Sequence, residues 1–245
     1  MKKIPILIFL IFFLIGCSTV NHRTNVRFRD YFKESKKIAI MPLDVKIFLL
    51  TAGDVNQYKD DWTREVKGLL LKTLQENLEG QKMIEPVIFD VSRLSISEKD
   101  TLDAQNGIFR AVSQGVIDHT YNSQTLIKDR KNNFDYTLGA EFSVVEKWSG
   151  APTAFYISGR NYIWTFGRSA MYIFAMAVFG ESVVYVVPPG NEYFMMALVD
   201  TPTGDIIWFN YIPMPGDLRD EKVMGKIVKK MLDDFSKGLE EKKGD

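Results

Sequence analysis

Runs of apolar residues alternate with charged ones along most of the chain, and their spacing predicts both strands and helices. Residues 36–43 are β-rich and end just after a proline, as a strand leaving a sheet would. Between residues 57 and 79, apolar side chains recur every three or four positions, the period of an amphipathic helix, and Gly80 follows as its stop. A short strand is predicted over 87–89 and a second helix over 102–119.

Alternation with a period of two dominates the second half of the chain. It predicts a long strand over 134–148 and two more strands over 192–199 and 205–211. The last two are joined by Asp-Thr-Pro-Thr-Gly, in which Pro202 fits the first corner of a turn and Gly204 can take a positive φ. This arrangement predicts an antiparallel hairpin near the C-terminus.

A final amphipathic helix is predicted over 220–239, with Val223, Ile227, Met231 and Phe235 on one stripe. The predicted order is therefore strand, helix, strand, helix, antiparallel strands and helix. That order favours an α/β (α+β) fold, with a mixed sheet, helices packed on it and an antiparallel C-terminal hairpin.

A long apolar insert interrupts this pattern between Gly159 and Pro188. Residues 169–180 carry no charged side chain and are apolar on every face of a helix, so we expect them to be shielded from water. Twelve residues are too few to cross a bilayer as a helix. Three readings stay open: a buried core helix or hairpin, an interface with a partner or a second copy, and a membrane-inserting hairpin.

The aromatic residues around this segment bear on the choice. A membrane hairpin would be flanked by Tyr162, Trp164 and Phe166 on one side and by Val183, Tyr185 and Val187 on the other. Ile163 and Val184 break the polar face that a barrel strand needs, which favours an interface over a pore. The predicted interface residues are Tyr162, Trp164, Phe166, Met171, Phe174 and Phe179.

The N-terminus carries a different kind of signal. Met1-Lys2-Lys3 is followed by an almost wholly apolar stretch over 4–15, which is typical of a secretory signal peptide and is too short for a transmembrane anchor. The stretch ends in Leu14-Ile15-Gly16-Cys17, which resembles the lipobox of bacterial lipoproteins. That resemblance implies cleavage before Cys17 and acylation of its thiol. Ser18, which is not aspartate, implies outer-membrane sorting in the enteric pattern, with the domain on the periplasmic face.

Cysteine usage agrees with this reading, because Cys17 is the only cysteine in 245 residues and no internal disulfide can form. The predicted organisation is a signal peptide (1–16), a lipidated cysteine with a polar tether (17–35), one α/β domain (36–240) with the apolar insert at about 159–188, and a polar tail (241–245). Aromatic residues within the tether, such as Phe28, are expected to dock on the domain.

Charge and reactive residues narrow the classes of function. The 31 basic and 31 acidic residues balance, and no basic stripe suggests a nucleic-acid partner. His22 and His119, the only histidines, are predicted to lie in the tether and at a helix end, so no metal site is expected. Asp200 and Asp205 flank the predicted turn and are expected to cap backbone groups. No nucleophile elbow, dinucleotide motif or P-loop occurs, and neither catalysis nor a cofactor is expected.

The strand at 37–43, the strand beginning Phe134-Asp135-Tyr136 and the hairpin over 198–208 together resemble a group of Gram-negative outer-membrane lipoproteins with a TolB amino-terminal-like domain. The group includes the curli-secretion channel protein and peptidoglycan-synthase activators. The resemblance covers most of residues 36–240 in element order, and the apolar insert departs from the channel pattern. It implies a non-catalytic envelope assembly or interaction module, with envelope proteins as partners and possible homo-oligomers. The alternative is a self-assembling secretion channel.

Overall fold

The computed structural model describes residues 22–30, 37–79, 84–182 and 192–240. The predicted leader, Cys17 and the flanking residues Val183, Tyr185 and Val187 lie outside these ranges. The strands are β1 (His22–Thr24), β2 (Lys37–Ile40), β3 (Asp44–Leu50), β4 (Asn56–Tyr58), β5 (Glu85–Ile88), β6 (Thr153–Trp164), β7 (Tyr193–Asp200) and β8 (Ile206–Pro213). The α-helices are α3 (Asp60–Glu79), α4 (Ile96–Thr120), α5 (Lys128–Asn132), α6 (Val144–Ser149), α7 (Phe166–Phe179) and α9 (Glu221–Glu240).

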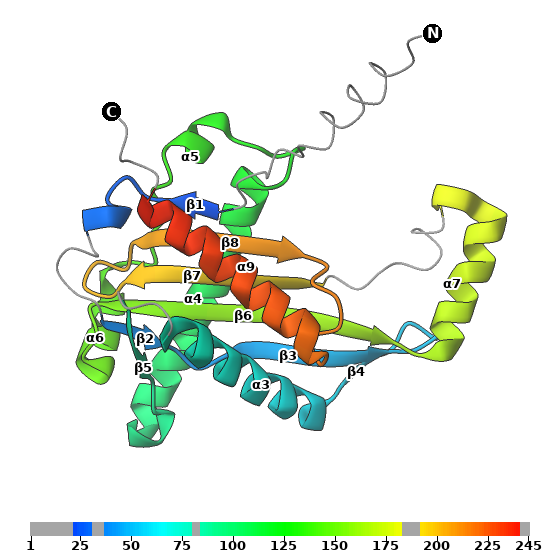
Figure 1. Ribbon diagram of the computed structural model, residues 1–245, viewed down its shortest axis with the longest axis horizontal. Helices are drawn as coiled ribbons and strands as arrows, with labels where there is room; N and C mark the ends of the chain where they lie inside the picture. The colour runs from blue at the N-terminus through cyan, green and yellow to red at the C-terminus, as the bar shows by residue number, and fades with distance from the viewer. Residues whose placement is uncertain (1–21, 31–36, 80–83, 183–191, 241–245) are drawn as a thin grey trace, which may run out of the picture.

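In the described residues, these eight strands form one mixed sheet. Six of them follow one another in the order β1-β8-β7-β6-β2-β5, β3 also pairs with β6, and β4 pairs with β3. β2 and β3 both run parallel to β6, β2 along its first residues and β3 along its last seven. β7 pairs antiparallel with β6 and β8 antiparallel with β7. The long strand β6 is therefore the axis of the sheet, and it extends past β2 and β7 toward one end of the molecule with β3 beside it (Figure 1).

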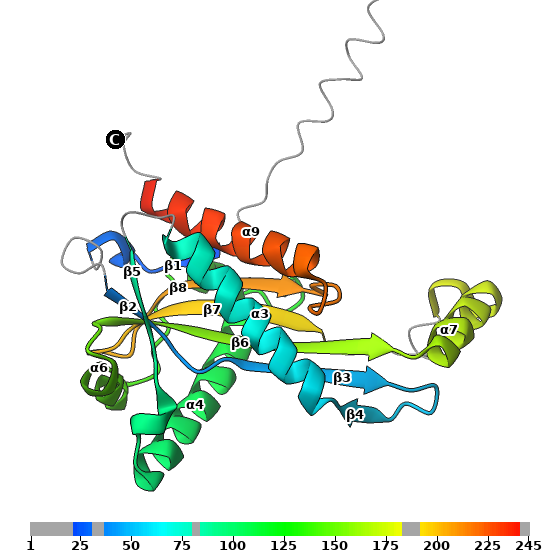
Figure 2. The same ribbon diagram turned by 60° about the horizontal axis from the view of Figure 1, so that its bottom comes forward.

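Helices cover both faces of the sheet. α3 and α9 lie on one face and α4 on the other (Figure 2). Along β6 the side chains alternate between these two layers: Phe155 and Ile157 join the first cluster, and Ala154 and Tyr156 join the second. Because both faces are buried, the central strands are apolar at nearly every position. The fold is therefore the mixed α/β class expected from the sequence.

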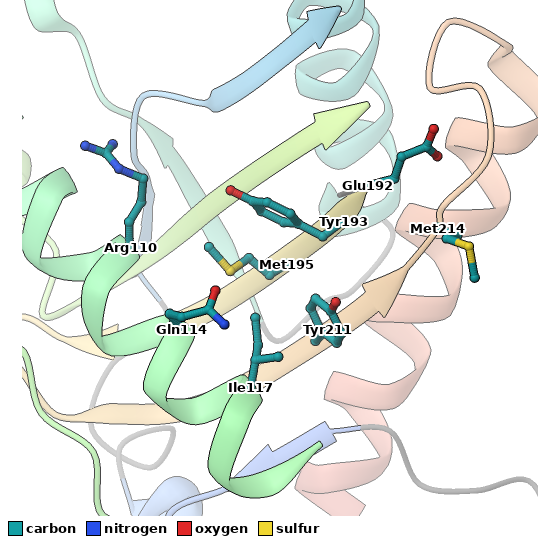
Figure 3. Close-up of a pocket in the computed structure, with 8 residues that line it drawn as sticks. All are labelled: Arg110, Gln114, Ile117, Glu192, Tyr193, Met195, Tyr211 and Met214. Atoms are coloured by element: carbon teal, nitrogen blue, oxygen red, sulfur yellow. The ribbon is translucent and has the colours of Figure 1, made fainter. Parts of the chain in front are cut away.

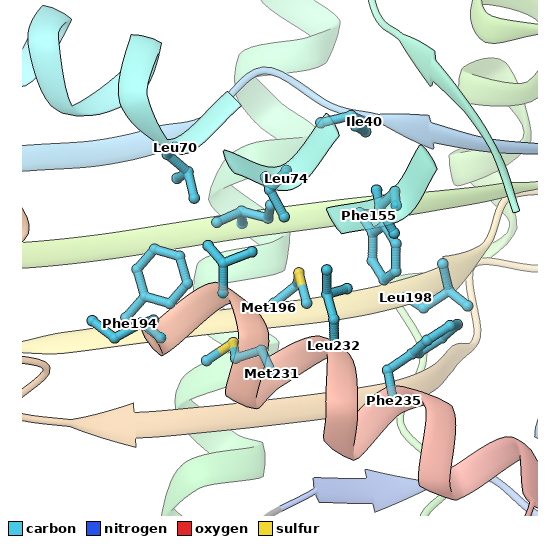
Figure 4. Close-up of a cluster of buried hydrophobic side chains, with 14 of the residues drawn as sticks. Ile40, Leu70, Leu74, Phe155, Phe194, Met196, Leu198, Met231, Leu232 and Phe235 are labelled. Atoms are coloured by element: carbon cyan, nitrogen blue, oxygen red, sulfur yellow. The ribbon is translucent and has the colours of Figure 1, made fainter. Parts of the chain in front are cut away.

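The first layer contains the larger core (Figure 4). Phe235 of α9 lies at its centre, with its ring 5.5 Å from that of Phe155 and 5.4 Å from that of Trp208, both in edge-to-face geometry. Phe28 packs 5.6 Å from the same ring, as expected for an aromatic residue docking from the N-terminal segment. Burial of each such side chain contributes about 1.5–3 kcal/mol. This cluster fixes α9 against the sheet.

Several elements match the predictions. The helices α3, α4 and α9, the strand β2 and the β7–β8 hairpin all lie where the pattern placed them. Gly204 has φ 76°, and an added Cβ there would come within 2.2 Å of the Gly139 oxygen. α4 begins six residues earlier than predicted because Ser95 and Glu98 form a capping box.

Other predictions were wrong. Residues 134–148 do not form a long strand: only Thr137 makes an isolated bridge, to Asp205, and the segment then turns into a 3-10 helix (Ala140–Ser143) and α6. The predicted tether contains β1, a strand that pairs with β8, so residues before position 36 already belong to the sheet in the part of the chain that the structure describes. The predicted insert also starts too early, because residues 159–164 belong to β6.

Candidate functional site

The most unusual feature of the fold is a helix that stands apart from the body. α7 lies at the far end of the long axis, beyond the ends of β3, β4 and β6 (Figures 1 and 2). We call α7, together with the strand ends that carry it (residues 48–58 and 161–165), the apolar arm. A core position for this helix was one of the three readings of the sequence, and the structure rules it out for α7, in which only Arg168 and Ala175 are buried.

The outer surface of α7 is apolar. Phe166 is 89% exposed and Phe174 is 72% exposed, whereas large apolar side chains normally lie inside a protein. The exposed large hydrophobic residues of this helix are Phe166, Met171, Ile173, Phe174, Met176, Val178 and Phe179. A contiguous exposed surface of this kind marks a site of contact with a protein or a membrane.

The first turn of α7 is fixed to the hairpin formed by β3 and β4. The Thr165 amide donates to the Leu50 carbonyl at 3.0 Å, and the Thr165 hydroxyl caps the helix by accepting from the Arg168 amide. These contacts continue the β3–β6 ladder directly into the helix. The position of α7 is thus set by its N-terminal turn.

Arg168 completes the attachment. Its side chain is only 1% exposed, and its guanidinium donates to the Thr51 carbonyl at 3.1 Å and pairs with the Asp54 carboxylate at 3.0 Å. The guanidinium carbon lies 5.3 Å from the centre of the Trp164 ring. Asp54 holds a φ of 62°, which aspartate tolerates in a tight turn. The one charge of α7 is therefore neutralised and turned inward.

Aromatic side chains surround the base of α7. Phe48 stacks on Tyr162 with 5.1 Å between ring centres and meets Tyr58 at 5.8 Å, while Trp164 contacts Tyr172 at 5.1 Å. Burial raises the pKa of the Tyr162 hydroxyl above its ordinary value. We call Phe48, Tyr58, Tyr162, Trp164 and Tyr172 the aromatic collar. It forms a zone of aromatic rings between the charged body and the apolar helix.

All six predicted interface residues lie on this arm. Tyr162 and Trp164 are half-buried in the collar, and the other four are exposed on α7. The sequence reasoning missed the attachment by Arg168, Asp54 and Thr51, because it did not predict the β3–β4 hairpin. The Gly53-Asp54 pair after an apolar run was the signal that could have revealed this turn.

A cavity of about 530 Å³ lies elsewhere, between α4 and the exposed ends of β7 and β8 (Figure 3). Its walls combine polar and apolar side chains: Arg110, Gln114, Ile117, Glu192, Tyr193, Met195, Tyr211 and Met214. Burial raises the pKa of Glu192, although Asn161 donates a hydrogen bond to its carboxylate at 3.3 Å. The Arg110 guanidinium forms an ion pair with the Asp44 carboxylate, with 3.2 Å between Nη1 and Oδ2. The cavity is therefore lined by aromatic side chains, Tyr193 and Tyr211, together with polar ones such as Arg110, Gln114 and Glu192.

The residues considered for chemistry have structural partners. His119 contacts the Tyr136 hydroxyl at 3.1 Å through Nδ1, and His22 is a buried residue of β1, not of a tether. Asp200 accepts from the Thr203 amide at 3.2 Å, as expected for a turn residue, and Asp205 pairs with Arg27. Across the residues that the structure describes, no group of three His, Cys, Asp or Glu side chains could hold a metal ion. None of the helices described there is at once long and apolar enough to cross a membrane.

Comparisons with known proteins show a weak structural similarity and no match by sequence. No protein-family model matches this chain, and neither does any curated protein. Among solved structures, the LpoB C-terminal domain from Salmonella enterica aligns with 12% sequence identity over 72% of this chain and 81% of that chain, with a TM-score of 0.25.

Proposed function

We propose that this protein is an envelope lipoprotein that works by binding and not by catalysis. Acyl chains on Cys17 attach it to a membrane, by preference the periplasmic face of the outer membrane, and the domain serves as an assembly or interaction module for an envelope complex. The short apolar leader and the lipobox-like Leu14-Ile15-Gly16-Cys17 support the anchor. Several acyl chains on one residue anchor a protein stably, since each buried methylene contributes about 0.8 kcal/mol. We include kinship with the TolB amino-terminal-like lipoproteins in this proposal.

The observation that carries the proposal is the apolar arm. Exposed phenylalanine, isoleucine and valine side chains lower stability and solubility unless something covers them. The chain nevertheless exposes seven large apolar side chains, five of these types and two methionines, on one helix and fixes that helix with a buried arginine. A surface built in this way serves docking, so we assign the arm as the envelope-docking surface.

The polar residues support a binding role. In the part of the chain that the structure describes, the Asp44 carboxylate accepts a hydrogen bond from Arg160, and the Asp200 carboxylate accepts one from the Thr203 amide. Both carboxylates thus have structural partners. The cavity walls combine tyrosine, methionine and isoleucine with Arg110, Gln114 and Glu192, a mixture that suits contact with a ligand or peptide.

Mass spectrometry of the protein purified from native envelopes tests the anchor. We expect a chain that begins at Cys17 and carries acyl chains on that residue. A chain with an intact leader or a free thiol would contradict the proposal, because the location and the docking role both depend on that anchor.

A photo-crosslinking residue at Phe174, introduced in intact cells, tests the docking surface. The matched control is Ile96, which is 82% exposed in the first turn of α4 and lies on the body. Adducts at 174 and not at 96 are expected. Equal labelling at both positions would count against the arm as the docking surface.

The Phe174→Asp variant separates docking from folding. It should keep the wild-type unfolding transition, because the side chain is exposed, and lose the association. Size-exclusion chromatography with light scattering addresses the channel alternative: a closed ring of many copies that Phe174→Asp dissolves would favour self-assembly over an interaction module.

A further inference from the structure

We propose that the apolar arm docks on lipid: α7 inserts into one leaflet of a bilayer and gives the protein a membrane contact separate from the acyl anchor. This inference deepens the proposed function, since it names the medium that meets the docking surface. It rests on that proposal only for the role of the arm, because the geometry of α7 does not depend on Cys17.

The distribution of apolar side chains around α7 favours lipid over a protein groove. At about 100° per residue, Ile173, Phe174, Met176 and Val178 point in directions that span about 200°, a little over half of the helix circumference. Arg168, Ser169, Tyr172 and Ala175 form the stripe that is buried or half-buried. A helix in a protein groove needs an apolar stripe of little more than 100°, whereas hydrocarbon accepts apolar side chains in every direction.

The lack of polar groups points the same way. Protein interfaces have polar rims and about one hydrogen bond per 100–200 Å². Between residues 169 and 180, only Ser169 and Tyr172 carry hydrogen-bonding side chains, and the Ser169 hydroxyl already donates to the Thr165 carbonyl at 3.3 Å. In the middle of α7 the backbone groups pair within the helix, as hydrocarbon requires, and at its first turn the Arg168 amide donates to the Thr165 hydroxyl. This surface offers a protein partner very little for specific recognition.

The dimensions fit one leaflet. α7 has 14 residues, so it is about 21 Å long and cannot span a hydrocarbon core of about 30 Å. Figure 1 shows that the helix runs across the end of the molecule instead of continuing β6. A helix about 10 Å in diameter lying in this way fits within the roughly 15 Å of one leaflet.

The collar suits the boundary of that leaflet. Tryptophan and tyrosine favour the membrane interface because their rings combine an apolar body with a polar tip. Trp164, Tyr162 and Tyr58 lie at the base of α7, between the helix and the charged body. Arg168, the one charge of the helix, is neutralised by Asp54 on the body side. Aromatic rings, a compensated charge and an apolar helix thus follow one another in the order that an interface requires.

Lipid quenching measured on the acylated protein tests this inference. Once Cys17 is acylated, Phe174→Cys supplies the only free thiol, and a polarity-sensitive fluorophore is attached there. Ile96→Cys is the matched control on the body. The protein is reconstituted into vesicles of phosphatidylethanolamine and phosphatidylglycerol, with and without lipids that carry a nitroxide on the acyl chain. A blue-shifted emission quenched by the nitroxide is expected at 174, and neither effect is expected at 96.

Each other outcome overturns the proposal. A water-like, unquenched emission at 174 would place the arm in solvent. A blue-shifted emission that the nitroxide does not quench would place it against protein, either a second copy or another envelope component. The mass of the same sample reports acylation separately. If Cys17 proves unmodified, the labels are read in a Cys17→Ser background, so failure of the anchor and failure of insertion are told apart.

A second substitution checks that quenching follows hydrocarbon burial of the helix. Phe179→Asp, added to the labelled Phe174→Cys protein, should lower the ratio of inserted to exposed arm by about 100-fold, the penalty for a carboxylate in hydrocarbon. Phe179→Leu should leave the quenching unchanged. Retained quenching in the aspartate variant would show that the label meets lipid without insertion of α7, and would overturn the inference.

Discussion

At the residue scale, Tyr156 of β6 is a buried polar group without compensation. Its ring packs 5.1 Å from those of Phe109 and Phe142, and its hydroxyl has no hydrogen-bond partner in the described part of the chain. Burial raises the pKa of this hydroxyl. Tyr156→Phe should therefore raise the free energy of unfolding by up to about 1 kcal/mol. Tyr121→Phe is the matched control: its hydroxyl donates to the Phe209 carbonyl at 3.3 Å, so a loss of about 0.5–1.5 kcal/mol is expected in urea unfolding. A destabilised Tyr156→Phe variant would contradict this account.

Glu192, at the rim of the cavity, makes stability depend on pH. Burial raises its pKa above the ordinary value of 4.5, so folding favours the protonated form. Its contribution to stability is thus full below pH 4.5 and is lost as the pH rises through the raised pKa. Glu192→Gln keeps an acceptor for Asn161 and cannot ionise, so it should be more stable than wild type at neutral pH, with a smaller difference near pH 4. Urea unfolding at both pH values measures this. The same difference at both pH values would show that the Glu192 carboxylate does not titrate in this way.

At the element scale, the close approach of β6 and β7 depends on Gly159. A Cβ there would lie 3.1 Å from Cδ2 of Phe194 and 3.3 Å from the Tyr193 oxygen, and the buried Phe194 has little room to move. Gly159→Ala should cost about 1–3 kcal/mol through overpacking, as measured by chemical denaturation. Gly225→Ala, inside α9 with open space around it, should instead add about 0.5–1 kcal/mol. Equal effects at the two sites would mean that the glycine at 159 is not required by packing.

Sequence pattern predicted the elements that bury one face and missed those whose neighbours decide their shape. α3 and α9 each place one apolar stripe on the sheet, which leaves the 3.6-residue period visible. β6 is buried on both faces along its first half, so that half shows no alternation and was not predicted, and residues 159–164 were assigned to the apolar insert. The alternation at 134–138 was real, since Phe134 and Leu138 are buried, but Gly139 at φ 92° ends the extended segment. Period alone could not reveal that turn.

At the scale of the whole molecule, the pairing of β1 shortens the segment that is predicted to link the domain to the membrane. The predicted tether ran to residue 35, yet His22 already pairs with Asn210 in the sheet. Five peptide units join Cys17 to His22 and can span at most about 18 Å. An acylated Cys17 would therefore hold the β1 edge near the bilayer surface.

Local composition was enough to predict acylation of Cys17 and an apolar docking segment. The attachment of α7 through Arg168 depends instead on contacts across more than a hundred residues, which no local pattern encodes.

The separation of arm and body predicts that the two are independent in stability. Because α7 buries only Arg168 and Ala175, replacing residues 167–180 with a Gly/Ser segment of equal length should change Tm by less than about 3 °C. The matched replacement in α9 removes Met231, Leu232 and Phe235 from the core and should abolish cooperative unfolding. Thermal unfolding followed by circular dichroism measures both. A large fall in Tm for the arm variant would place α7 in the cooperative unit of the fold, and its exposed apolar side chains would then need an explanation within the chain itself. An unchanged Tm would agree with the proposal that these side chains are covered by something outside the chain.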